Sequence, residues 1–272
     1  MDRKIRIGAL ISGSGTNLQS IIDACESGKI SGKMVFVGTD NSSAKGLKRA
    51  EKHSIPFFIV DYPEIIKTIA TGSKKTEIPE DFDLDSIFSK QTIFPDTADY
   101  EKVKRFLITR AVAEAALLEK MNLFEFDLLV LAGFMRNLTP YFIDRVNIDP
   151  DHPKIMNIHP ALLPSFPGVD GYGDTFQYGC KVGGCTVHFI NYGEDSGPII
   201  GQKSFAIEPD DTIDSIKEKG LKKEWELYPD CIQLFADSRL KTEKVFFTMG
   251  NGKKVRRTIV KILKTDGSLL PD

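Results

Sequence analysis

A glycine-rich turn between a predicted strand and a predicted helix, close to the N-terminus, constrains the fold of this chain more than any other feature. The apolar run Ile5–Ile11 is typical of a buried strand, and Ser12-Gly13-Ser14-Gly15-Thr16-Asn17 follows it directly. Apolar side chains then recur at helical spacing as far as Cys25, and Gly28 stands where the helix should end.

Further strands and helices alternate along the chain. Apolar runs predict strands at 34–39, 57–60, 127–131 and 155–158, and periodic positions predict helices at about 45–53, 103–121, 140–146 and 212–236. This alternation favours an α/β fold: a Rossmann-like, mostly parallel twisted sheet flanked by helices. Residues 184–190 and 199–207 alternate apolar and polar side chains, which predicts mixed or antiparallel strands in the C-terminal half.

The chain is expected to be a single domain over residues 1–272. Its first half, about 1–100, contains an insertion near 71–99 where the pattern dissolves into polar residues with one short turn of helix. The second half covers about 101–240. A terminal hairpin is expected at 241–272, with strands at 245–249 and 255–262 around Gly250-Asn251-Gly252.

Composition argues against several classes of protein. Lysine and arginine number 36 against 38 aspartates and glutamates, a net charge of −2, so no nucleic-acid or membrane surface is indicated. No apolar run approaches the ~20 residues that span a bilayer, and the N-terminus lacks a signal-peptide pattern. Four cysteines show no metal-binding or disulfide spacing. We therefore expect a cytoplasmic protein with reduced thiols.

The glycine loop is a candidate phosphate site. Backbone amides at the start of a helix are unsatisfied and lie at the positive end of its dipole, so they bind phosphate. The loop has neither dinucleotide-binding spacing nor the lysine of a nucleoside triphosphate site. A tight turn without a ligand is the alternative, and the loop alone does not decide between the two.

A second candidate site is Asn157-Ile158-His159-Pro160. Side chains alternate along a strand, so Asn157 and His159 share one side of its C-terminal end, where open α/β sheets bind ligands. An asparagine amide can donate to a developing oxyanion, and a histidine can hold or move a proton near neutral pH. The alternative is that His159 is a structural histidine.

The remaining titratable candidates are an aspartate in a turn and three histidines. Asp195, followed by Ser-Gly-Pro, is either a turn former or a carboxylate that tunes a histidine or organises a proton-relaying water. His53 and His152 are expected at the surface without partners. His188 lies in an alternating strand and is expected to pack near a site rather than to react.

Five blocks of this sequence, in this order, resemble the phosphoribosylglycinamide formyltransferase family. They are LISGSGTNLQ at 10–19, LAGFMR at 131–136, NIHPALLPSFPG at 157–168, DSGPIIGQ at 195–202, and Glu224 ahead of Leu227-Tyr228-Pro229. The resemblance spans about 5–240 apart from the insertion. It implies the formyltransferase fold and transfer of a formyl group from 10-formyltetrahydrofolate to the amine of glycinamide ribonucleotide, a step of purine synthesis that leads to IMP and needs no metal.

The resemblance also implies roles for particular residues. Asn157 and protonated His159 would stabilise the oxyanion, and Asp195 would raise the proton affinity of the histidine and position a water. Glu224 would contact the ribose hydroxyls. The substrate phosphate would be held by Gly13, Gly15, Thr16 and Asn17. The pterin pocket would be lined by Met135, Arg136, Asn137, Leu138, Ile143, Ile190 and Asn191.

Two segments depart from the family pattern. After Gly168 the family continues with a histidine-bearing helix start, where this chain has VDGYGDTF at 169–176. The insertion near 71–99 replaces a shorter connection that carries an arginine near the folate.

Three other interpretations remain open. Formyltetrahydrofolate deformylase uses the same core but usually has an N-terminal regulatory domain and needs no phosphate loop. Methionyl-tRNA formyltransferase would have a further C-terminal domain and a basic tRNA surface, whereas the basic residues of 253–264 are more simply a solvated hairpin face. A non-catalytic phosphometabolite-binding protein would have lost a member of the catalytic trio. The expected partners are small molecules, and the chain is expected to be a monomer or a homodimer.

Overall fold

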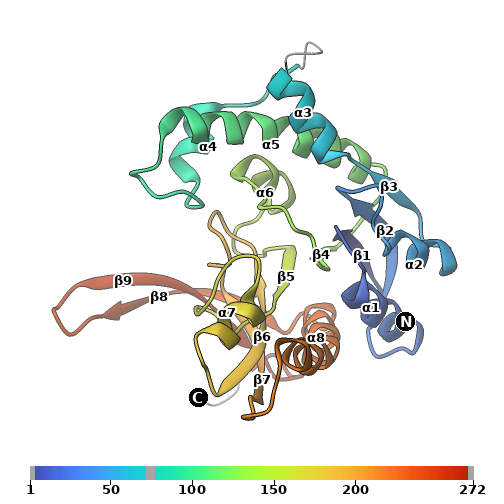
Figure 1. Ribbon diagram of the computed structural model, residues 1–272, viewed down its shortest axis with the longest axis vertical. Coiled ribbons are helices and arrows are strands. Elements are labelled where there is room, and N and C mark those ends of the chain that lie inside the picture. The colour runs from blue at the N-terminus through green and yellow to red at the C-terminus, as the bar shows by residue number, and fades with distance from the viewer. Residues whose placement is uncertain (1–3, 72–76, 269–272) are drawn as a thin grey trace.

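Seven strands form the central sheet of the computed structural model, which describes residues 4–71 and 77–268. They are β1 (Ile5–Ile11), β2 (Gly32–Thr39), β3 (Phe57–Ile59), β4 (Leu128–Leu131), β5 (Ile155–His159), β6 (Val182–Phe189) and β7 (Ile199–Ala206). Their order is β3-β2-β1-β4-β5-β6-β7 (Figure 1). The first five pair in parallel, and β5-β6 and β6-β7 pair antiparallel. The predicted fold class is therefore confirmed.

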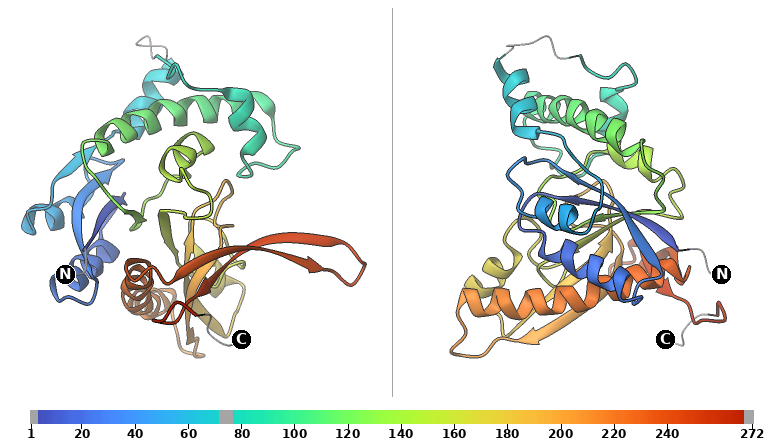
Figure 2. Two further views of the ribbon diagram at one scale, coloured as in Figure 1. Left: turned by 180° about the vertical axis from the view of Figure 1, so that it is seen from behind. Right: turned by 90° about the vertical axis from the view of Figure 1, so that its right-hand side faces the viewer.

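Helices cover both faces of the sheet, as the views of Figures 1 and 2 agree. They are α1 (Thr16–Glu26), α2 (Leu47–Lys52), α3 (Tyr62–Thr71), α4 (Leu84–Lys90), α5 (Tyr100–Met121), α6 (Pro140–Val146), α7 (Gly171–Gln177) and α8 (Ile213–Ala236). Residues of α1, α2 and α8 contribute to the hydrophobic cluster on one face, and residues of α3, α5 and α6 to the cluster on the other. No helix among the described residues is long and apolar enough to cross a membrane.

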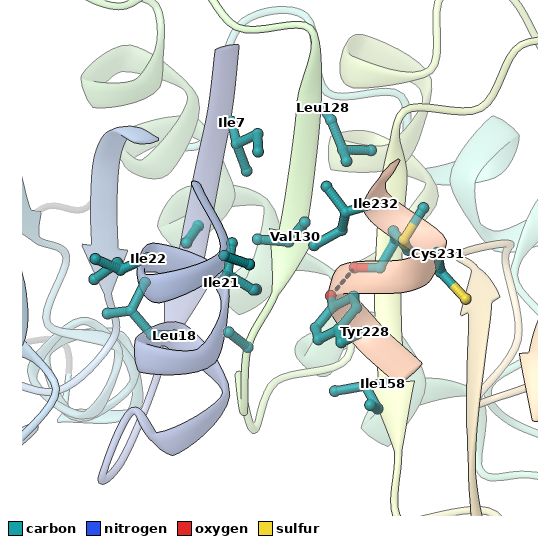
Figure 3. Packing of buried hydrophobic residues seen from close by; sticks show 14 of the residues in the cluster. Ile7, Leu18, Ile21, Ile22, Leu128, Val130, Ile158, Tyr228, Cys231 and Ile232 are labelled. Atoms are coloured by element: carbon teal, nitrogen blue, oxygen red, sulfur yellow. Dashed lines mark hydrogen bonds between the residues drawn. The ribbon is translucent and has the colours of Figure 1, made fainter. Parts of the chain in front are cut away.

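Alternation along β1 divides the core between these two faces. Ile7 and Ile11 belong to the cluster with α1 and α8, whereas Leu10 belongs to the cluster with α5 and α6. Figure 3 shows side chains of α1 and α8 packed over the sheet. The buried Tyr228 hydroxyl of α8 donates to the carbonyl of Met156 at 2.8 Å. This bond fixes α8 to β5 immediately before Asn157.

Two helices, α3 and α7, were not predicted from the sequence. Each begins beside an aspartate that accepts a backbone N–H bond: Asp61 Oδ1 from Glu64, and Asp170 Oδ1 from Gly173. Isoleucine and threonine in α3, and two glycines in α7, obscure the helical pattern because these residues have low helix propensity.

The C-terminal hairpin consists of β8 (Leu240–Thr248) and β9 (Lys254–Ile262), and its first strand begins five residues earlier than predicted. In Figures 1 and 2 the hairpin projects away from the central sheet. The four cysteines are all free thiols.

The insertion is packed against the body rather than being a loose loop. It contains α4, whose first turn is capped by Asp83 Oδ1 accepting from Ser86 N. Ile87 of α4 is buried in a third apolar cluster with Leu107 of α5 and Tyr141 of α6. The 72–76 part of the predicted insertion lies outside the described residues.

A buried carboxyl group joins α5 to α6. Glu114 is fully buried and accepts hydrogen bonds from both the backbone N–H and the hydroxyl of Thr139, at the start of α6. Burial raises the pKa of Glu114 from 4.5 to about 7, although the Thr139 hydrogen bonds act in the opposite direction.

This raised pKa predicts a pH-dependent stability. Because the folded-state pKa exceeds the unfolded one, the stabilisation is full below about pH 4.5 and is lost as pH rises through about 7. The free energy of unfolding should fall by up to about 3 kcal/mol between pH 5 and 8 from this group. Glu114→Gln, which stays neutral and can still pair with Thr139, should flatten that fall. Urea unfolding at both pH values checks this, and parallel pH profiles for the two proteins would contradict it.

Candidate active site

A cavity lies where the three parallel strands β1, β4 and β5 end. β1 lies between β2 and β4 in the sheet. After β1 the chain continues outward to β2 on one side, and after β4 it continues to β5 on the other, so the loops that follow β1 and β4 move away from each other. The cavity has a volume of about 220 Å³. Its lining comes from the start of α1, from the segments after β4 and β5, from the turn between β6 and β7, and from α8, with Ile93 of the insertion added.

Asn157, His159 and Asp195 all line this cavity. The side chain of His159 is 3% exposed, and its Nδ1 lies 3.2 Å from Oδ2 of Asp195. Its Nε2 faces the carbonyl oxygen of Phe166 at 2.8 Å, so that nitrogen carries a proton. Both ring nitrogens therefore face acceptors, which suits a doubly protonated, charged imidazole.

The loop that holds His159 is strained at one residue. Phe166, whose carbonyl receives the Nε2 proton, has a φ of 54°, a left-handed conformation that costs energy in a residue other than glycine.

His188 supports the same cluster from behind. It is fully buried, with Nδ1 facing the carbonyl of Phe189 at 2.9 Å and Nε2 facing Nδ2 of Asn157 at 3.2 Å. Its Nε2 is also 3.6 Å from Oδ1 of Asp195. The expectation that His188 packs beside a site agrees with this placement.

The carboxylate of Asp195 is kept ionised by its surroundings. Burial would raise its pKa, but the nearby ring of His188, the charge of His159 and the amide N–H of Gly168 together hold it below the ordinary value of 3.8. The Gly168 amide donates to Oδ2 at 2.9 Å. Asp195 itself has a φ of 45°, as a tight turn requires.

A buried carboxyl group forms the other end of the cavity. Glu224 of α8 is 4% exposed and accepts from Nδ2 of Asn17 and from the hydroxyl of Tyr172, both at 2.6 Å. Burial raises the pKa of Glu224 in spite of these two bonds. The Oδ1 atom of Asn17 is buried without a hydrogen-bond partner among the described residues, so a ligand donor there would satisfy it.

Tyr172 was missed by the sequence analysis. It lies in the segment that departs from the family pattern, and α8 makes room for its ring at Gly220, where an added Cβ would stand 2.1 Å from the ring. Residues 169–176 depart from the family pattern, but this departure does not indicate a partner for Tyr172. That partner, Glu224, lies 52 residues away in sequence. Only the folded chain brings the two together.

The glycine loop is shaped by close backbone packing. Gly15 has a φ of 70°, and an added Cβ would lie 2.8 Å from the Cα of Gly46. Arg49 donates from Nε to the carbonyl of Ser14 at 3.0 Å. Thr16 and Arg49 line a neighbouring groove with Trp225 rather than the main cavity. Gly13 and Gly15 are likewise absent from the cavity lining, whereas Asn17 is part of it.

Most of the residues predicted for a second ligand line the same cavity. They are Met135, Arg136, Asn137, Leu138, Ile190 and Asn191. Ile143 instead is buried in the apolar cluster formed with α3, α5 and α6. Ile190 is partly buried and packs against the same cluster. Arg136 is held by Nε contact with Oδ2 of the buried Asp40 and lies over the ring of Tyr62.

Two histidines have partners that the sequence analysis did not predict. His53 has a side chain only 14% exposed and pairs through Nδ1 with Oε1 of Glu26 at 2.7 Å. His152 is exposed as predicted, but its Nδ1 lies 2.7 Å from Oδ2 of Asp149. The prediction that both lack partners is therefore wrong, because these contacts depend on local turns and on the packing of α1 against α2. Within residues 4–71 and 77–268, no group of three or more His, Cys, Asp or Glu is placed to hold a metal ion.

Comparison with known proteins gives a consistent family. A family model described as formyl transferase matches residues 5–232. The chain is 34% identical over 236 residues to the phosphoribosylglycinamide formyltransferase of Haemophilus influenzae, with 87% of this chain and 89% of that protein covered. The Escherichia coli protein of the same name is 31% identical over 237 residues, with coverages of 87% and 90%. The crystal structure of glycinamide ribonucleotide transformylase 1 from Symbiobacterium toebii matches with a TM-score of 0.69 and 32% identity, over 97% of this chain and 96% of that one.

Proposed function

Since this chain belongs to the formyl transferase family, we propose that it transfers the formyl group of 10-formyltetrahydrofolate to the amine of glycinamide ribonucleotide, in the pathway to IMP. Family membership, predicted above from five sequence blocks, is confirmed. The observation that carries the proposal is the joining of the Asn157, His159 and Asp195 cluster to the buried Asn17–Glu224 pair in one cavity. One group of residues serves the reaction, and the other serves the acceptor.

The reaction begins with attack by the neutral amine on the formyl carbon. The tetrahedral intermediate carries an oxyanion, which the Asn157 amide and the charged imidazole of His159 stabilise. Nε2 of His159 leaves the Phe166 carbonyl and donates to that oxygen instead. A single donor of this kind typically contributes about 2.7–4 kcal/mol to the transition state.

Proton transfer completes the reaction. The amine loses a proton as it becomes an amide, and N10 of the folate must gain one as the C–N bond breaks. Asp195, ionised and within 3.2 Å of His159, balances the charge of the imidazole and accepts hydrogen bonds from a relaying water. These steps use side chains of this chain and need no metal.

The acceptor is assigned to the Glu224 end of the cavity. Ribose hydroxyls donate to the Glu224 carboxyl oxygens and to the unpartnered Oδ1 of Asn17. The phosphate lies at Gly13, Gly15 and Thr16, where backbone amides open α1. Arg49, which bonds to the Ser14 carbonyl, adds positive charge beside that loop.

The donor is assigned to the end lined by residues 135–138, 190 and 191. Apolar walls with a few polar groups suit a flat heterocycle with a hydrogen-bonding edge. Leu138 and Ile190 supply apolar surface, and Asn137 and Asn191 supply polar groups. This combination fits the pterin ring of a folate.

The acceptor end favours the transferase over a deformylase. A deformylase needs only water at the formyl carbon, whereas this chain lines the far end of its cavity with a buried carboxyl and an amide, and a phenol outside the lining bonds to that carboxyl. We place the reaction in the cytoplasm, where four free thiols are stable.

The fate of the formyl carbon tests the proposal. With a carbon-13 formyl donor, NMR should show the label in the amide of the ribonucleotide and very little in formate. Label that appears in formate at the same rate with or without ribonucleotide would overturn the transferase and support a deformylase.

Tyr172→Phe is expected to weaken acceptor binding selectively. Loss of the phenol removes one of the two donors to the buried Glu224 carboxyl, which then holds the ribose less firmly. The KM for glycinamide ribonucleotide should rise by roughly 5- to 20-fold, while the KM for the folate changes little. Tyr178→Phe, at an exposed tyrosine a few residues away, is the matched control. An equal rise in both KM values would contradict the assignment of this end to the acceptor.

A further inference from the structure

Part of the insertion lies directly against the cavity. The backbone N–H of Thr92 donates to the carbonyl of Tyr192 at 2.9 Å. The next residue, Ile93, is half-buried and contributes to the cavity lining. A segment that interrupts the sequence pattern of the family therefore forms part of the wall of the site.

Side chains anchor this segment on both sides. Lys90 Nζ lies 2.6 Å from Oδ2 of Asp144 on α6, and the hydroxyl of Tyr192 donates to Oδ1 of the same aspartate. On its other side, Phe94 packs against the third apolar cluster, with its ring 5.0 Å from that of Phe106 on α5. The position of Ile93 between these anchors is fixed by the fold.

The segment and the loop that precedes Asp195 approach closely. A Cβ added at Gly193 would lie 2.7 Å from Oγ1 of Thr92, so only glycine allows this contact without a shift. Ile93 consequently belongs to the end of the cavity formed by residues 190–193, to which Ile190 and Asn191 also contribute. The Asn17–Glu224 pair marks the other end.

We propose that Ile93 is a specificity-determining residue for the formyl donor, with its side chain forming an apolar wall against the donor's aromatic rings. This inference rests on the proposed function and deepens it. A branched aliphatic side chain packs well against the apolar face of a ring, and it has no polar group that could bind a carboxylate. The contact thus selects for the ring portion of the folate and not for its glutamate tail.

Ile93→Ala tests this directly. The dissociation constant of 10-formyltetrahydrofolate and its KM should rise on the order of tenfold, because an apolar contact is lost from the pocket. The KM for glycinamide ribonucleotide and kcat should stay within about twofold. Ile93→Leu should restore most of the affinity. Ile78→Ala is the matched control, because Ile78 is 47% exposed in the same insertion and does not line the cavity.

A donor that lacks the glutamate separates ring contact from tail contact. The loss in Ile93→Ala should be the same for 10-formyltetrahydropteroate as for the full donor. Unchanged donor affinity, or a loss seen only with the glutamate-bearing donor, would overturn the inference. Because donor affinity is measured by equilibrium binding without acceptor, a wild type that binds donor but transfers nothing would overturn the proposed function alone.

Discussion

His159→Ala is expected to lower kcat by about 10³- to 10⁴-fold, the largest effect of any single substitution in this chain. The imidazole is both an oxyanion donor and the charged partner of Asp195, 3.2 Å away, so its removal takes away two contributions at once. The KM values should change far less, because His159 acts on the developing charge rather than on either bound substrate. Steady-state kinetics under saturating folate and ribonucleotide measure this.

The matched control is His152→Ala, which removes an exposed histidine whose contact is a local pair with Asp149. It should leave kcat within about twofold. Thermal unfolding of both variants separates lost chemistry from lost structure, since His159 is buried. If His159→Ala retained more than about a tenth of the wild-type kcat while folded, the assigned mechanism would be wrong.

Asp195→Asn is expected to lower kcat by about 10²- to 10³-fold. The asparagine keeps the size of the side chain and can still accept from the Gly168 amide, but it brings no charge to the imidazole. Because the pKa of Asp195 lies below 3.8, the wild-type carboxylate is ionised throughout the range from about pH 5 to 9. The ratio of wild-type to variant kcat should therefore not collapse as the pH falls to about 5.

The free energy of unfolding should also depend on the ionisation of Asp195. A depressed folded-state pKa contributes stability that is present above the unfolded value of 3.8 and is lost as pH falls through the folded value. The wild type should thus be more stable than Asp195→Asn at pH 7 and at pH 5, with the difference fading only below about 3.8. Urea unfolding at these pH values measures it, and a difference that vanishes by pH 5 would show that the carboxyl is not held ionised.

The sequence predicted the elements whose burial pattern is simple. The run Ile5–Ile11 and the strand that carries Asn157 are short apolar runs because both of their faces are buried, and the helix after Ile11 repeats apolar residues at helical spacing because one of its faces is buried. Helices α3 and α7 escaped prediction since their sequences are poor in helix formers and depend on an aspartate cap and on packing.

The sequence predicted residues of the candidate site only where they lie in a recognisable motif. Asn157 and His159 lie two residues apart on one strand, and the resemblance supplied Asp195 and Glu224 from distant blocks. Tyr172 and Ile93 could not be found in this way, because each is placed by a long-range contact: the tyrosine bonds to Glu224 of the cavity lining, and the isoleucine follows Thr92, which bonds to Tyr192. Such contacts leave no period or spacing in the sequence.

The most direct measurement is the folate absorbance change when the protein is mixed with 10-formyltetrahydrofolate, with and without glycinamide ribonucleotide. The account predicts turnover that requires the ribonucleotide and saturates with it, and that is lost in His159→Ala. Turnover that is equally fast without ribonucleotide would contradict the transferase assignment, and so would the absence of turnover from protein that binds both compounds.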